Sequence, residues 1–595
     1  MTMTASRARQ TLSVRAAPAR VPLPVWCAFA VAIFAGAAFF FDPARLTATL
    51  GDTDDATRMI EVRELLAGQS WFDMTLSRFG GAHPLVSHWS RLIDLPIAML
   101  LSAYELVLEP AQAELATRAT WPLVLLLAFL YLLAREAEVR NGRKAVLITI
   151  VVAMTCVGTV QFLPGRIDHH GAIILCAVIG LLRLARSFDD PNAGWSAGIF
   201  LGLANAIGYE ALTLIAPLFG VAVLYGLLPR RSLQGPSNAA VTFAATLAIA
   251  LSVTTASSSL FVSHCDALSF NLVALATIGA IGVCLVQAIE HRISTVAKFA
   301  ILAVTGAAAI GSYVWAEPAC LAGPFGQVDP EVVPIWLRHV SETKNILSLP
   351  PQSIAITFAY FVIAFYCGVR LSQSERDDAL RFHMLMLLIA IPLSLWQIKL
   401  LPYALFLTAQ LIGGYLGTTQ PAACQPMSKL TKGMFAVALL LLVGGAGWIL
   451  FSVSTPMVRS LKARTQAIDN CLSTASITPL THLPAGLAVT DVNLGPYLVN
   501  LTQLDALAAP YHRLGSSIVE AHRILHASPA DAERRLRAVG ARYVITCDAL
   551  SSTEPQRGVP DDALRKLLLA SEPPAFLDPV PLPAPTQLKV WQLKP

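Results

Sequence analysis

Long apolar stretches recur through most of the chain, and each approaches the roughly 20 residues that a helix needs to cross the hydrocarbon core of a bilayer. Thirteen stretches have this character: 21–41, 119–134, 145–163, 171–187, 194–208, 211–228, 238–258, 269–289, 297–315, 352–370, 382–397, 400–417 and 433–452. Apolar residues make up 55% of the 595 residues and charged residues only 14%, which argues against a soluble enzyme. The sequence therefore predicts an α-helical polytopic membrane protein with about 13 transmembrane helices.

The basic residues indicate the orientation of these helices, because Lys and Arg concentrate in cytoplasmic loops. The first 20 residues carry four Arg and no acid, so we expect 1–20 to be a cytoplasmic N-terminal tail and 21–41 to be a retained helix. A cleaved signal peptide is the alternative. The stretch 92–108 is apolar enough to span, but a span there would place the basic loop 135–144 outside. We therefore expect 43–118 to be one large outer loop with amphipathic helices in the interface.

With this topology the other outer segments are 164–170, 259–268, 316–351 and the C-terminal part of the chain. Ten of the twelve His residues fall on the outer side. The net charge of +5 is small and no DNA-binding pattern occurs, so no nucleic-acid partner is expected. We expect the protein in the inner membrane of a bacterium, with its outer side in the periplasm.

The composition changes after about residue 453, and residues 459–595 read as a soluble α/β domain behind a transmembrane domain over 21–458. We expect extended runs at 486–489 and 504–511, a helix over 517–539 and a strand at 541–546. An odd number of spans would place this domain in the periplasm. Two disulfides could form there, Cys265–Cys320 between outer loops and Cys471–Cys547 within the domain; free thiols are the alternative.

An acidic motif, Gly51-Asp52-Thr53-Asp54-Asp55-Ala56-Thr57-Arg58, follows the first span. Three carboxylates so close together near a lipid boundary can hold a divalent cation, or a cation bound to phosphate. A solvated turn that caps the next helix is the alternative, because Asp is a favoured N-cap residue.

The short second outer loop reads Gly165-Arg166-Ile167-Asp168-His169-His170. A carboxylate followed two positions later by an imidazole can supply two ligands to one divalent cation. Because this loop and the acidic motif lie on the same predicted side, we interpret Asp168 and His170 as part of one site with it.

Other outer residues are candidates for binding sugar or phosphate. His88 and Arg91 flank Trp89, although an interfacial Trp anchor would explain that segment as well. Tyr511-His512-Arg513 forms an aromatic, imidazole and guanidinium cluster suited to phosphate or sugar, or else a structural turn. Glu210 lies where two short spans meet, and an acid inside a membrane protein is a functional candidate by default.

This layout resembles the catalytic subunit of the oligosaccharyltransferases, and more broadly the GT-C class of membrane glycosyltransferases. The shared features are about 13 spans, an acidic motif in the first outer loop, Asp-His-His in the second, Val340-Ser341-Glu342 in a later outer loop and a C-terminal outer domain. The resemblance implies metal-dependent transfer of a sugar or oligosaccharide from a polyprenyl-(pyro)phosphate donor to a glycan, lipid or protein acceptor.

The resemblance also implies roles for single residues. Asp52, Asp54, Asp55 and Glu342 would be catalytic, with Asp54, Asp168 and His170 holding Mg²⁺ or Mn²⁺. Glu342 would orient or activate the acceptor. Lys399 looks like the family's basic residue facing the donor phosphates, although it could instead be a lysine that snorkels to the interface. From their own chemistry, we expect donor phosphate or substrate also to contact Arg58, His88, Arg91, His169, His512 and Arg513.

One feature departs from the resemblance: no two of the ten Trp are adjacent, so the Trp-Trp-Asp motif of protein N-glycosylating members is absent. This argues against an asparagine-sequon acceptor. The rival classes are a transporter or flippase, in which the same acids would couple ions to movement, and a metal-independent ligase of lipid-linked polymers. No inverted repeat supports a transporter.

Overall fold

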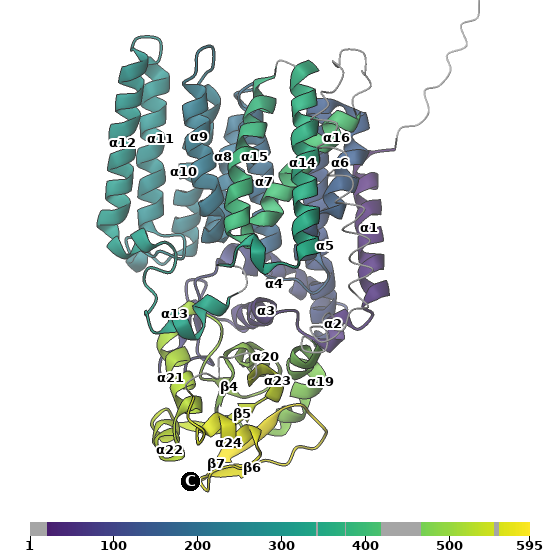
Figure 1. The fold of residues 1–595 in the computed structure, drawn as a ribbon, viewed down its shortest axis with the longest axis vertical. Coiled ribbons are helices and arrows are strands. Elements are labelled where there is room, and N and C mark those ends of the chain that lie inside the picture. The colour runs from purple at the N-terminus through teal and green to yellow at the C-terminus, as the bar shows by residue number, and fades with distance from the viewer. Residues whose placement is uncertain (1–20, 341–342, 375–376, 418–465, 552–558) are drawn as a thin grey trace, which may run out of the picture.

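A computed structural model describes residues 21–340, 343–374, 377–417, 466–551 and 559–595. A bundle of long helices forms one half of the molecule, and a smaller C-terminal domain lies at one end of the bundle (Figure 1). The helices between residues 21 and 417 are α1 (Leu23–Phe41), α2 (Arg45–Ala48), α3 (Thr53–Leu66), α4 (Arg91–Glu105), α5 (Pro110–Asn141), α6 (Arg143–Thr155), α7 (His170–Arg186), α8 (Ala193–Ile207), α9 (Leu212–Gly226), α10 (Gln234–Thr254), α11 (Phe270–Ile289), α12 (Thr295–Ala316), α13 (Val332–Ile335), α14 (Pro351–Ser374), α15 (Asp378–Trp396) and α16 (Leu401–Gly417).

Nine helical segments among the described residues are long and apolar enough to cross a membrane. Several expose large apolar side chains: in α12, Val296, Val304 and Trp315 are 78%, 69% and 85% exposed. Faces of this kind favour lipid over water, and the chain is a multi-pass membrane protein of the predicted fold class. Helix α6 has only 13 residues and α8 only 15. The predicted span 433–452 lies outside the described residues, so the span count stays a prediction.

Close packing of small residues holds the inner helices together. Helix α7 is buried along most of its length. Gly198 of α8 faces α10, where an added Cβ would lie 2.1 Å from the carbonyl oxygen of Ala239. A larger side chain at 198 would force the two helices apart.

The segment between α1 and α5 folds into α2, α3, α4 and a two-stranded hairpin of β1 (Thr75–Leu76) and β2 (Leu85–Val86). Helices α3 and α4 lie between the bundle and the C-terminal domain (Figure 1). Asp52 caps α3 by accepting hydrogen bonds from the backbone N–H groups of Asp54 and Asp55, and Asp55 returns the contact to the N–H of Asp52. Gly51 precedes this capping box with a φ of 90°, and a Cβ there would collide with Asp55.

The C-terminal domain contains a five-stranded sheet in the order β4-β3-β5-β7-β6. Strand β3 pairs in parallel with β4 and β5, and β7 pairs antiparallel with β5 and β6. Its strands are β3 (Leu487–Thr490), β4 (Asp505–Ala506), β5 (Ala541–Thr546), β6 (Leu577–Pro579) and β7 (Lys589–Leu593). Its helices are α19 (Thr474–Ile477), α20 (Gly495–Leu501), α21 (Gly515–His526), α22 (Pro529–Ala538), α23 (Asp548–Ser551) and α24 (Leu564–Leu569).

The strand predicted at 541–546 is present, whereas two other expectations for this domain are wrong in detail. The helix expected over 517–539 is two helices, because Pro529 occupies the first turn of α22 and cannot continue α21. The extended run expected at 504–511 contains only the two-residue strand β4. Both predicted disulfides, Cys265–Cys320 and Cys471–Cys547, are formed.

The C-terminal domain packs directly on α3. The Tyr511 hydroxyl donates to the carbonyl oxygen of Thr53 at 2.9 Å and also bonds Thr57 Oγ1 at 2.7 Å. The side chain of Asn500 donates to the carbonyl oxygen of Ala56 at 2.6 Å. These contacts hold the predicted acidic motif between the domain and the bundle.

Candidate active site

A cavity of about 450 Å³ lies where the segment between α1 and α5, the bundle and the C-terminal domain meet. Its walls combine acids, imidazoles, aromatic rings and a lysine from segments far apart in the sequence. The polar and aromatic lining residues are Asp52, Thr53, Asp54, His88, Trp89, His169, His170, Asn205, Tyr209, Glu210, Asp266, Phe325, Trp336, His339, Lys399, Asn493, Tyr511 and His512. A second cavity of about 320 Å³ shares Trp336, His339 and Asn493 with the first.

Three carboxylates form what we call the acid cluster: Asp52, Asp55 and Asp168, with oxygens within 4.8 Å of one another. Arg166 lies among them; its guanidinium contacts Asp52 and Asp168 and approaches Asp55 Oδ2 at 3.3 Å. The other oxygen of Asp55 accepts from the backbone N–H groups of Ile167 at 2.7 Å and Asp168 at 3.1 Å. The cluster thus ties the start of α3 to the loop before α7.

The charges of the acid cluster are only partly balanced. Burial raises the pKa of Asp55 well above its usual value, and the neighbouring charges of Asp52 and Asp168 act in the same direction. Burial alone would lower the pKa of Arg166, but Asp168 and Asp55 raise it. Arg166 therefore remains a cation that meets much of the charge of the three acids.

A second set, which we call the imidazole group, consists of His169, His170 and Glu210, again with ligand atoms within 4.8 Å. His170 Nδ1 lies 2.9 Å from Glu210 Oε1. His169 is only 8% exposed, and its Nδ1 is buried without a hydrogen-bond partner among the described residues. Burial lowers the pKa of His169 well below its usual value, and His170 lowers it further, so the ring is neutral at pH 7. All three side chains line the cavity.

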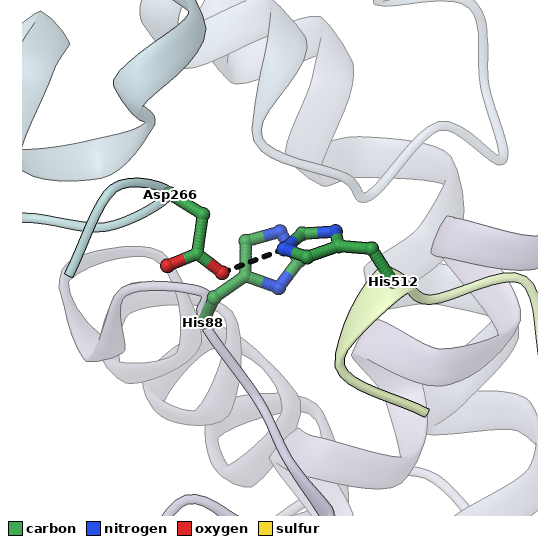
Figure 2. Close-up of side chains that lie close together, drawn as sticks. All are labelled: His88, Asp266 and His512. Atoms are coloured by element: carbon green, nitrogen blue, oxygen red, sulfur yellow. Dashed lines mark hydrogen bonds and ion pairs between the residues drawn. The ribbon is translucent and has the colours of Figure 1, made fainter. Parts of the chain in front are cut away.

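A third set brings together His88, Asp266 and His512 from three separate segments (Figure 2). His512 Nε2 lies 2.6 Å from Asp266 Oδ2. Arg513 donates to both oxygens of Asp266, at 2.7 and 2.8 Å. The rings of His88 and His512 pack with their centroids 4.7 Å apart.

Of the twelve predicted site residues that the structure describes, seven line the cavity and five do not. The seven are Asp52, Asp54, His88, His169, His170, Lys399 and His512. Arg58 and Arg91 are buried below Trp89 instead: Arg58 pairs with Glu61 and Asp94 and stacks on the Trp89 ring at 4.4 Å, and Arg91 pairs with Asp94.

The remaining predicted residues lie behind the wall or outside the described part of the chain. Asp55 and Asp168 belong to the acid cluster, and Arg513 holds Asp266. Of the predicted metal ligands, Asp168 pairs with Arg166 and also accepts from the backbone N–H of His170, whose side chain faces Glu210. Glu342 lies outside the described residues.

Sequence reasoning missed Arg166 and Asp266. Arg166 lies within the quoted loop motif, and a cation beside three acids is the signal that could have singled it out. Asp266 follows Cys265 in an outer loop, and a carboxylate next to a predicted disulfide is the only comparable signal.

The imidazole group fits a divalent cation better than the acid cluster does. His169 offers a buried nitrogen that lacks a partner, in the neutral form that binds metals. In the acid cluster, Arg166 already supplies positive charge, and backbone N–H groups bond Asp55 on both of its oxygens.

Comparisons with known proteins identify the fold. No protein-family model and no curated protein sequence matches the chain. Solved structures do match: the archaeal oligosaccharyltransferase AglB from Archaeoglobus fulgidus, in complex with an inhibitory peptide and a dolichol-phosphate, has a TM-score of 0.60 at 13% identity over 93% of this chain and 72% of that chain. The A. fulgidus oligosaccharyltransferase in complex with Zn and sulfate has a TM-score of 0.54 at 14% identity, over 88% and 68%.

A further structure of the A. fulgidus enzyme, tethered to an acceptor peptide with an NVT sequon, has a TM-score of 0.57 at 14% identity, over 92% of this chain and 72% of that chain. The chain has the GT-C fold of membrane glycosyltransferases. Within that class it resembles the oligosaccharyltransferase type, as the sequence layout predicts.

Proposed function

We propose that the protein is a GT-C-type glycosyltransferase that moves a sugar or an oligosaccharide from a polyprenyl phosphate or pyrophosphate to an acceptor on the periplasmic side of a bacterial inner membrane. The observation that carries this proposal is the cavity in which acids, imidazoles and Lys399 converge between the bundle and the outer domain. The fold shared with AglB, which was solved with a dolichol-phosphate, supports a lipid-phosphate donor.

The donor phosphate is expected near Lys399. This lysine lines the main cavity and also a smaller one of about 170 Å³ next to His170 and Tyr403. A lysine ammonium is a compact point charge that stabilises the negative charge growing on the leaving phosphate oxygen. The apolar helices would hold the polyprenyl tail, and the second cavity beyond Trp336 and His339 would admit the acceptor, which can be a glycan, a lipid or a protein.

We further propose that His169, His170 and Glu210 hold a divalent cation. When bound there, the cation would act as a Lewis acid toward the donor phosphate oxygens. A set of two imidazoles and one carboxylate suits Mn²⁺ better than Mg²⁺, which prefers oxygen ligands and water. Asp54, which the sequence also predicts as a metal ligand, lines the same cavity.

The test uses the purified full-length protein in lipid nanodiscs with a panel of undecaprenyl-phosphate-linked and undecaprenyl-pyrophosphate-linked sugars. The expected result is release of the lipid phosphate together with transfer of labelled sugar, lost after chelation and restored by Mn²⁺. Assays with the same donors in sealed proteoliposomes distinguish a glycosyltransferase from a transporter. Movement of intact donor across the bilayer without cleavage would overturn the proposal. Transfer that persists at full rate after complete metal removal would overturn only the cation.

A further inference from the structure

His512 and Asp266 form a pair that reaches the cavity from outside the bundle. His512 comes from the C-terminal domain just before α21, and Asp266 from the loop between α10 and α11. Figure 2 shows the carboxylate directed at the edge of the imidazole, with Nε2 and Oδ2 2.6 Å apart. Both side chains line the cavity.

Asp266 is fixed from two directions. Arg513 donates hydrogen bonds to both of its oxygens, and Arg513 also donates to the carbonyl oxygen of Val86 at 3.2 Å. The neighbouring Cys265 is bonded to Cys320, which ties down the loop. Burial opposes ionisation, but the hydrogen bonds from Arg513 and His512 hold the pKa of Asp266 well below its usual value. Asp266 is therefore an anion that can only accept hydrogen bonds.

The ionised carboxylate orients the imidazole. Because Asp266 only accepts, Nε2 of His512 is the nitrogen that donates to it, and in the neutral ring Nδ1 then keeps its lone pair. No hydrogen bond to Nδ1 occurs within the described part of the chain. The ring also packs against His88 and Phe325, with ring centroids 4.7 and 5.4 Å away, and both contacts help to fix its orientation. The charged or titratable groups that face it are Asp266, Arg513 and His88.

The ligand atoms of His88, Asp266 and His512 also lie within 4.8 Å, the spacing of a metal site. Arg513 argues against a cation there, because its guanidinium already bonds both oxygens of Asp266. An aspartate that orients an imidazole whose second nitrogen is left to accept a proton is instead the arrangement of general-base catalysis.

We propose that His512 is the general base of the transfer reaction, with Asp266 as its positioning residue, and that the acceptor group is a hydroxyl. The inference rests on the proposed function. As the acceptor oxygen bonds the anomeric carbon of the sugar, its proton passes to Nδ1 of His512. The bond from the anomeric carbon to the phosphate oxygen breaks, and its electron pair leaves on the lipid phosphate.

An alcohol of a sugar or lipid suits this base because its oxygen keeps free lone pairs after binding. The nitrogen of an amide shares its lone pair with the carbonyl and is a poor nucleophile without further distortion. The absence of adjacent Trp residues already argues against a sequon acceptor.

The test compares wild type with His512→Gln, Asp266→Asn and Asp266→Glu in nanodiscs, using the donor panel above. Octyl glucoside is the hydroxyl probe and an Asn-X-Thr peptide the amide probe. His512→Gln keeps an N–H but has no proton-accepting nitrogen. We expect kcat for octyl glucoside to fall by about 10²–10⁴-fold with the donor KM unchanged. Asp266→Asn should also lower kcat, Asp266→Glu should restore part of it, and the peptide should receive no sugar from wild type.

Two controls separate catalysis from folding. His482→Gln changes an exposed histidine of the same domain and should transfer at the wild-type rate. His512→Ala removes the ring, and added imidazole should restore transfer in this variant alone, which a structural role would not predict. Equal kcat in wild type and His512→Gln, or an inactive His512→Ala that imidazole does not rescue, would overturn the inference while leaving the glycosyltransferase intact. A wild type that cleaves no donor would overturn the proposed function and the inference with it.

Discussion

The acid cluster and the imidazole group meet at the start of α7 but satisfy their charges in different ways. In the acid cluster, Arg166 and backbone N–H groups bond the carboxylates of Asp52, Asp55 and Asp168. In the imidazole group, His170 and Glu210 pair across the cavity wall, and His169 leaves a buried nitrogen without a partner. The two groups are linked by the backbone N–H of His170, which donates to Asp168 Oδ1 at 2.9 Å.

This difference indicates that the acid cluster holds the site together, whereas the imidazole group takes part in its chemistry. A cluster of carboxylates suggests a metal site, yet an arginine of the same chain can balance the same negative charge. The acid cluster joins two segments that are far apart in sequence, whereas all three side chains of the imidazole group line the cavity that a substrate would enter. The comparison assigns stability to the first group and ligand binding to the second, and each assignment can be tested.

Removing Arg166 should have the largest effect. The variant Arg166→Met leaves three carboxylates within 4.8 Å without their cation, in a largely buried place. Loss of one partner from a buried ion pair costs about 3–5 kcal/mol, so we expect a clearly lower unfolding midpoint in detergent. The matched control is Arg523→Met, which breaks an exposed pair with Glu331 and should cost about 0.2–1 kcal/mol. If Mn²⁺ restored the Arg166→Met midpoint, the acid cluster would bind a cation, and its purely structural role would be contradicted.

Replacing one acid in each group by its amide should show which group binds metal. We expect Glu210→Gln to weaken Mn²⁺ binding by more than the roughly 10- to 100-fold that loss of an outer-shell partner costs. Asp168→Asn should change the affinity less and the unfolding midpoint more, because Asp168 bonds Arg166. Isothermal titration of both variants with Mn²⁺, without donor, measures this directly. A larger loss of Mn²⁺ affinity in Asp168→Asn than in Glu210→Gln would instead support Asp168 as a metal ligand, as the sequence predicts.

The outline of the molecule was predictable from sequence because apolar length and basic loops follow simple physical rules. The long apolar helices are of this kind. The strand Ala541–Thr546 followed from its run of strand-forming residues, and the two disulfides from the positions of their cysteines in the predicted topology. The break at Pro529 was also readable, since a proline in the first turn marks the start of a helix.

The sequence predicted that several of the site residues lie near one another, but not which of them pair. Asp52, His170, Lys399 and His512 do share one cavity. Which acid pairs with which base depends on three-dimensional contacts, such as Arg166 with Asp168, that spacing along the chain does not determine. Arg58 illustrates the limit: next to an acidic motif it looks like a phosphate ligand, but helix α3 turns it toward Glu61 and Asp94.

The smallest expected effect comes from Asp52, the member of the acid cluster that also lines the cavity. Asp52→Ala removes the N-cap of α3, where the carboxylate accepts from the backbone N–H groups of Asp54 and Asp55. Loss of such a cap costs about 1 kcal/mol, which denaturant unfolding can resolve. Asp52→Asn keeps a capping oxygen and removes only the charge that meets Arg166; because Asp52 is 47% exposed, it should cost less. Both variants should bind Mn²⁺ as wild type does. If Asp52→Asn lost Mn²⁺ while keeping its stability, the boundary between the two groups would disappear, and the acid cluster would have to be counted among the metal ligands.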